Sequence, residues 1–162
     1  MSNIEQLISS AKKLSADTTV SAAGIFAFKD QYLKLVGWGT LGGVAGGALA
    51  GALGDAVGSV EAMHAQRNNA AQERGFDGYR VLVAVGATEI HLFDWVTSEG
   101  ASKLYYSIER ASVEVSIKKF GLSRHLYLKN VTSAETLALQ GNISPISSVS
   151  NGDKTVLRAL KP

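Results

Sequence analysis

Glycine recurs at every fourth position through the middle of this chain, and this spacing constrains the fold more than any other feature. Two rows interleave, with Ala50 filling a gap in the second: Gly39, Gly43, Gly47 and Gly51 form one row, and Gly42, Gly46, Gly54 and Gly58 the other. Residues four apart lie on one face of a helix, so the rows predict a stripe almost without side chains. Such a stripe lets a second backbone approach closely, which predicts helix packing or self-association.

A helix of this composition needs an external source of stability. A glycine in a helix interior costs about 1 kcal/mol relative to alanine, so the nine glycines between Gly37 and Gly58 cost on the order of 9 kcal/mol. That sum is comparable to the stability of a whole domain. Close packing against another helix would offset the cost, as would a bilayer, which forbids unpaired backbone groups.

Three structures remain open for this glycine-zipper segment, residues 35–74. Residues 35–54 carry no charge, and at about 1.5 Å per residue they match the thickness of a bilayer core, which suits a single transmembrane helix. A helical hairpin that bends near Gly46 and Gly47, or near Gly54, would insert partway or pack against copies of itself. The third structure is a flexible or buried segment of a soluble protein, which would make an oligomer interface.

The composition excludes several classes of protein. The chain has no cysteine, which excludes disulfides, thiolate catalysis and zinc or iron–sulfur sites built on cysteine. Its net charge is only +2 and its basic residues are scattered, so we expect no nucleic acid as a partner. The N-terminal residues MSNIEQLISSAKKL lack the basic and apolar regions of a signal peptide, so we expect a cytoplasmic protein at the cytoplasmic membrane.

The remaining residues predict a helix, a strand and then a β domain. Apolar spacing predicts an amphipathic helix over residues 1–15, and β-branched, small and aromatic residues predict a strand over residues 17–28. Residues 79–160 contain short β-type runs that recur about every ten residues, a pattern typical of an antiparallel meander. These runs are YRVLVAV, EIHLFDWV, KLYYSI, VEVSIKKF, RHLYLKNV and ETLALQG, and residues 151–160 then predict a C-terminal helix.

Three stretches of this β domain resemble the bacterial pleckstrin-homology-like (PH-like) domains. They are Arg80–Val85 with Glu89–Asp94, Ser107–Arg110 leading into Val113–Val115, and the Gly121–Arg124 turn before Leu126–Leu128. Ala22–Phe26 followed by a glycine-rich insertion is also similar to small actinobacterial proteins of unassigned function. The resemblance implies an α+β fold with a bent antiparallel sheet of about seven strands, capped by a C-terminal helix. It implies lipid, peptide or protein binding and rarely catalysis, and the clustered cations of phosphoinositide-binding members are not evident here.

If residues 17–28 supply the first strand of that domain, the glycine-zipper segment is an insertion within it. Both ends of the segment must then return to the same side of any membrane.

Two kinds of site find little support in the sequence. Gly37, Gly39 and Gly42 match the dinucleotide-binding pattern G-x-G-x-x-G, but Asp55 lies in the same helical run instead of ending a second strand. A nucleotide-binding protein therefore remains only a minor alternative.

The histidines and the Asp94–Trp95 pair also suggest no chemistry. His64, His91 and His125 lie far apart, so a metal site would require tertiary contact, and we expect no metal, cofactor or catalytic residue. Asp94 and Trp95 are expected to close a hairpin.

The best surface candidate is a predicted hairpin tip that places cations beside apolar residues: Lys118, Lys119, Phe120, Leu122 and Arg124. Such a tip suits an anionic membrane surface or a protein partner. The leading hypothesis is thus a non-enzymatic adaptor that associates with a membrane or with itself. In it, the glycine-zipper segment serves oligomerisation or insertion, and the PH-like domain binds a lipid or protein partner. The alternative from another class is a soluble homo-oligomeric scaffold subunit of a larger assembly.

Overall fold

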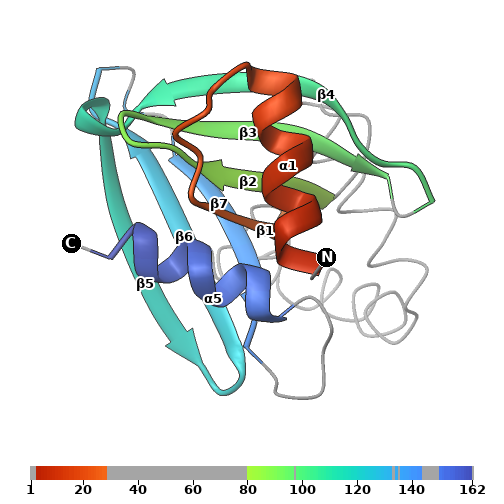
Figure 1. The fold of residues 1–162 in the computed structure, drawn as a ribbon. Coiled ribbons are helices and arrows are strands. Elements are labelled where there is room, and N and C mark those ends of the chain that lie inside the picture. Colours follow the sequence, from red (N-terminus) through yellow and green to blue (C-terminus); the bar gives the residue numbers. More distant parts are fainter. Residues whose placement is uncertain are drawn as a thin grey trace, which may run out of the picture.

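The computed structural model describes residues 3–28, 80–96, 98–132, 134, 136–143 and 150–161. Within these residues, two α-helices pack against a seven-stranded antiparallel sheet (Figure 1). The elements follow in the order α1 (Asn3–Ser15), β1 (Ala22–Phe28), β2 (Arg80–Val85), β3 (Glu89–Val96), β4 (Gly100–Glu109), the 3-10 turn η2 (Arg110–Ser112), β5 (Val113–Phe120), β6 (Ser123–Asn130), β7 (Thr136–Asn142) and α5 (Ser150–Ala159).

The expected fold class is confirmed at this level: the protein is α+β, with a seven-stranded antiparallel sheet and a C-terminal helix. The strands coincide with the β-type runs of the sequence because each run is bounded by residues that favour turns. Helix α1 lies where the sequence predicts an amphipathic helix, and its buried Leu7 and Ala11 are four residues apart, on one face.

Strand β1 lies in the middle of the sheet, although it precedes the other strands by a long stretch of chain. The strand order is β4-β3-β2-β1-β7-β6-β5, so β1 pairs with β2 on one side and with β7 on the other. Its pairing with β2 continues to Ala27 opposite Arg80, and residues 29–79 begin after Phe28 and end directly before Arg80. These residues are therefore an insertion between two hydrogen-bonded neighbours, and both of its ends lie at the same place on the sheet.

Alternate residues of the central strands enter two different hydrophobic cores. Val81, Val83 and Val85 of β2 pack in one core with α5, whereas Leu82 and Ala84 pack in another with α1. Because successive side chains of a strand point to opposite faces, the two helices cover both faces of β2. This double burial explains why RVLVAV is apolar almost throughout, without the alternation of a half-exposed strand.

Helix α5 approaches β1 backbone to backbone at a pair of glycines. A Cβ added to Gly24 would lie 2.7 Å from the Gly152 carbonyl carbon and 2.8 Å from the Asp153 amide nitrogen. A Cβ added to Gly152 would lie 2.8 Å from the Ala23 carbonyl oxygen. Glycine is thus required on both sides of this contact, which brings the first turn of α5 down onto β1.

The structure differs from one expectation and does not describe the segment of another. Asp94 and Trp95 lie inside β3 and Asp94 is buried, so the expectation that they close a hairpin is wrong; the chain stays paired with β4 as far as Val96. The glycine-zipper segment, residues 35–74, lies outside the described residues. None of the helices in the described parts of the chain has the length and apolar character needed to cross a bilayer.

Candidate functional site

The five residues of the predicted membrane or partner surface lie together at the tip of the β5–β6 hairpin. Gly121 and Leu122 form the turn, and Gly121 has a φ of +56°, in the left-handed region that favours glycine. Phe120 and Leu122 are 56% and 59% exposed, the largest exposures among the described large apolar side chains apart from Val131. The tip therefore presents two large apolar groups to its surroundings.

The side chains around this tip are held in place by local contacts. The Arg124 guanidinium donates hydrogen bonds from Nη1 to the carbonyl oxygens of Gly121 (2.8 Å) and Ser123 (3.0 Å), which closes the turn. The Phe120 ring stacks on the His125 ring with 4.3 Å between centroids. Lys118 Nζ lies 5.4 Å from the centre of the Tyr127 ring, within the range of a cation–π contact. The tip is thus an ordered apolar pair flanked by cations.

The other predicted site residues cannot be placed. The eight glycines of the predicted packing interface, and the Gly37-Gly39-Gly42 pattern of the nucleotide alternative, lie in residues 29–79, outside the described residues.

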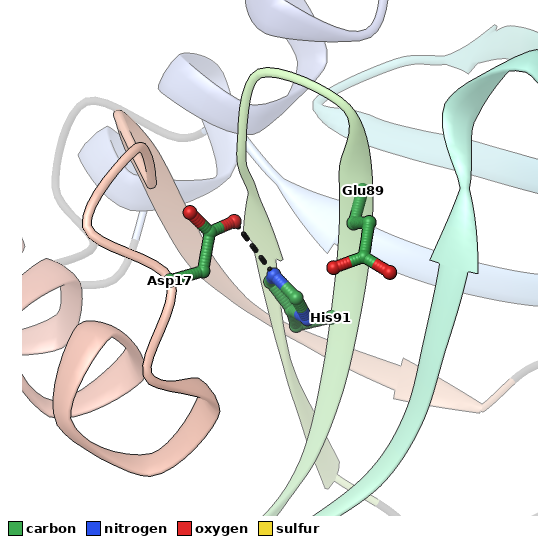
Figure 2. A group of neighbouring side chains, drawn as sticks. All are labelled: Asp17, Glu89 and His91. Atoms are coloured by element: carbon green, nitrogen blue, oxygen red, sulfur yellow. Dashed lines mark hydrogen bonds and ion pairs between the residues drawn. The ribbon is translucent and has the colours of Figure 1, made fainter.

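A second group of candidate side chains was not predicted from the sequence. Asp17, Glu89 and His91, called here the His91 cluster, each offer one ligand atom, and these atoms lie within 4.8 Å of one another (Figure 2). Asp17 comes from the loop between α1 and β1, whereas Glu89 and His91 lie two residues apart on β3 and so share a face. Figure 2 shows the two carboxylates on either side of the imidazole.

The Asp17 carboxylate is fixed by several hydrogen bonds. Its Oδ1 accepts from the backbone N–H of Thr19 (2.8 Å) and from the Thr19 hydroxyl (2.6 Å), and that hydroxyl accepts from the Ala87 N–H (2.9 Å). The Thr19 hydroxyl, followed by His91, lowers the pKa of Asp17 to about 2. Gly86 lies against the carboxylate so closely that an added Cβ would overlap Oδ2. Asp17 is therefore an anion held in a fixed position, in a space that exists because residue 86 has no side chain.

His91 is the buried centre of the cluster, with 1% of its surface exposed. Its Nε2 lies 2.9 Å from Asp17 Oδ2, and its Nδ1 lies 2.8 Å from the hydroxyl of Ser107, the residue opposite it on β4. Both ring nitrogens thus have partners that fix the plane of the imidazole. The arrangement can hold a proton between Asp17 and His91, or a cation in place of that proton.

Sequence reasoning missed this cluster because Asp17 and His91 are distant in the chain and meet only in the folded sheet. Two local signals were present. The residues Asp17-Thr18-Thr19 have the form of a turn in which an aspartate accepts hydrogen bonds from the residue two positions on. His91 is also a polar residue between the apolar Ile90 and Leu92 of EIHLFDWV.

A third polar group, Asp153, is buried where α5 meets the sheet. Asp153 is only 1% exposed, and its Oδ2 accepts a hydrogen bond of 2.8 Å from the Asn142 N–H. Its Oδ1 is buried and has no hydrogen-bond partner within the described structure. Burial raises the pKa of Asp153 to about 7, against the opposing effect of backbone hydrogen bonds from Asn142 and Ile25.

Comparison with known proteins adds no assignment: no protein-family model matches this chain, and a search of curated proteins finds none with significant similarity to it.

Proposed function

We propose that the chain is a non-enzymatic adaptor in which a PH-like domain carries an inserted glycine-zipper segment for membrane insertion or self-association. The seven-stranded antiparallel sheet, with a C-terminal helix packed on β1, supports the PH-like assignment. In Figure 1, strands β2–β4 run across the view and β5–β6 run along its height, as a bent sheet requires. The domain supplies a binding surface and the insertion supplies the association.

The observation that carries this proposal is the pairing that brackets the insertion. Ala27 and Arg80 are direct partners in the β1–β2 ladder, so the chain leaves the sheet and returns to it at adjacent strands. A segment tethered in this way enters and leaves a bilayer from the same side. A hairpin satisfies that condition, and a single crossing does not. The same tether suits a hairpin that packs against hairpins of other copies.

The β5–β6 tip supplies the second contact in this proposal. Phe120 and Leu122 have the exposure needed to enter the headgroup region, and the neighbouring cations Lys118, Lys119 and Arg124 attract anionic lipid. Each cation near such a surface contributes about 1 kcal/mol. Three of them contribute enough to favour a transient contact, which the insertion would make lasting.

Membrane fractionation tests the role of the insertion. The full chain is compared with a variant in which Asn-Gly replaces residues 29–78; this turn extends the β1–β2 ladder by one pair and closes it as a hairpin. We expect the full chain to resist high-salt and carbonate washes and the variant to be soluble and folded. If both are soluble, the segment acts by self-association. A full chain that is both soluble and monomeric contradicts the proposal.

The self-associating form of the proposal has its own test. Gly43→Leu and Gly47→Leu place large side chains on the predicted packing stripe and leave the sequence of the described residues unchanged. We expect both variants to lose higher-order species in light scattering while their circular dichroism stays unchanged. Oligomers of unchanged size would show that this stripe is not the interface.

A further inference from the structure

We propose that the His91 cluster, formed by Asp17, Glu89 and His91, binds a divalent transition-metal ion such as Zn²⁺. The proposal is independent of the adaptor function and concerns the opposite end of the β2–β3 hairpin from the insertion. Three ligand atoms from two remote parts of the chain converge there within 4.8 Å, around a histidine that the fold buries almost completely.

The donor set selects the class of ion. One imidazole nitrogen with two carboxylate oxygens suits Zn²⁺ and similar transition metals, because imidazole binds these ions well. Mg²⁺ and Ca²⁺ prefer sites made of oxygen alone. Two carboxylates also balance the charge of a divalent ion bound by a neutral imidazole. Water would complete the coordination shell, since three protein ligands leave at least one position open.

The geometry is close to what coordination requires. Asp17 Oδ2 and His91 Nε2 are 2.9 Å apart. Two ligands bound tetrahedrally at about 2.1 Å are separated by about 3.4 Å. An ion would therefore replace the proton between Asp17 and His91 once the two groups move apart by about half an ångström. Glu89 is partly exposed, at the start of β3, and its carboxylate would close onto the ion as the third ligand.

The surroundings of the cluster orient the ligands before an ion arrives. Metal-binding histidines usually give their second ring N–H to a fixed acceptor, and the Ser107 hydroxyl, 2.8 Å from Nδ1, has that position. Thr19 holds the far oxygen of the Asp17 carboxylate, so Oδ2 remains directed at the imidazole. Such outer partners contribute to affinity because they lower the cost of ordering the ligands.

A bound metal ion would link two parts of the fold that are far apart in the sequence. Asp17 lies two residues after the end of α1, whereas Glu89 and His91 belong to the β2–β3 hairpin. An ion between them would fasten the α1–β1 loop, and with it α1, to the sheet. The expected result is a protein whose N-terminal helix is more protected from exchange and proteolysis when Zn²⁺ is present.

Titration of the full chain with Zn²⁺ by calorimetry tests the proposal. We expect one ion per chain at this site and a loss of affinity of roughly tenfold or more in Glu89→Gln, which removes a ligand. The matched control is Glu109→Gln. Glu109 is the partner of Glu89 in the β3–β4 ladder and is exposed, so the control removes the same charge without removing a ligand. The control should bind Zn²⁺ like the unmodified chain.

Two further variants address how the site is built. Ser107→Ala leaves all three ligands in place and should weaken Zn²⁺ binding about tenfold through the loss of its contact with the imidazole. Gly86→Ala should displace the Asp17 carboxylate and weaken binding similarly, while circular dichroism confirms that the chain stays folded. If Gly86→Ala does not fold, Ser107→Ala and Glu89→Gln still decide the question.

The ring signals of His91 in NMR provide the readout that locates the ion. We expect them to shift in step with the calorimetric titration. The proposal is overturned if the chain shows no saturable Zn²⁺ binding. It is also overturned if Glu89→Gln and Glu109→Gln bind equally, or if the ring signals of another histidine shift while those of His91 do not.

Discussion

The buried carboxyl of Asp153 should make the stability of this protein fall as the pH rises towards neutrality. Its pKa is about 7 in the folded chain and 3.8 as the reference value for an unfolded one. Between these values the native state holds a proton that the unfolded state has lost. Because the native state binds more protons, the free energy of unfolding decreases with increasing pH through this window.

The size of this effect follows from the width of the window. The raised pKa spans about three pH units, and each unit corresponds to about 1.4 kcal/mol, so the contribution is about 4 kcal/mol between pH 4 and pH 8. Its cause is the loss of water around a carboxylate that receives backbone hydrogen bonds through one oxygen, while the other oxygen has no partner among the described residues. This amount is a large fraction of the stability of an ordinary domain.

Urea unfolding of the unmodified chain and of Asp153→Asn at several pH values between 4 and 8 provides the measurement. Asparagine is neutral throughout this range and has nearly the same shape, so the stability difference between the two proteins should change by about 4 kcal/mol in favour of the variant as the pH rises. Taking the difference cancels the other titrating groups. Glu109→Gln, which removes an exposed carboxyl, is the control for a general effect of charge. Parallel curves for the unmodified chain and Asp153→Asn would refute the reasoning.

Three further substitutions test contacts elsewhere in the fold. Gly24→Ala should cost about 3 kcal/mol in urea unfolding, because the new Cβ meets backbone atoms at the start of α5 that cannot rotate away. Arg110→Ala should lower the free energy of unfolding by about 2 kcal/mol, since its guanidinium donates hydrogen bonds to carbonyl groups after β2 and at the end of α5. Its control is Arg158→Ala, on the exposed side of α5, which should change that free energy by less than about 0.5 kcal/mol. The double variant Phe120→Ser with Leu122→Ser should likewise unfold like the unmodified chain but lose binding to vesicles containing anionic phospholipid, as measured by co-sedimentation.

The secondary structure was largely predictable because its signals are local. The run VEVSIKKF alternates in polarity and becomes β5, whose half-buried and exposed positions alternate in the same way over its first half. Asn-Gly-Asp at residues 151–153 predicts the start of a helix, and α5 begins one residue earlier, at Ser150. These features depend only on neighbouring residues, so a single sequence is sufficient to find them.

The polar sites were not predictable because they depend on how distant segments meet. Asp153 reads as an ordinary acidic residue in the first turn of a helix, where water would surround it. It is buried because Gly24 and Gly152 let the helix touch the sheet. Similarly, His91 acquires its partners from the strand register that places it opposite Ser107 and from the loop that carries Asp17. No local pattern in these segments predicts that His91, Ser107 and Asp17 come into contact.

The central position of β1 also bears on the order in which the protein folds as it is synthesised. Strands β5 and β6 each pair with the next strand along the chain, so these pairs can close soon after they emerge. Strand β1 emerges early, but its partners at Arg80 and Gln140 are translated long afterwards. The ribosome thus releases the whole inserted segment while the sheet still lacks both neighbours of β1. Any engagement of the segment with a bilayer or another copy has time to precede closure of the domain, and the edge of β1 that pairs with β7 remains unpaired until the last hairpin arrives.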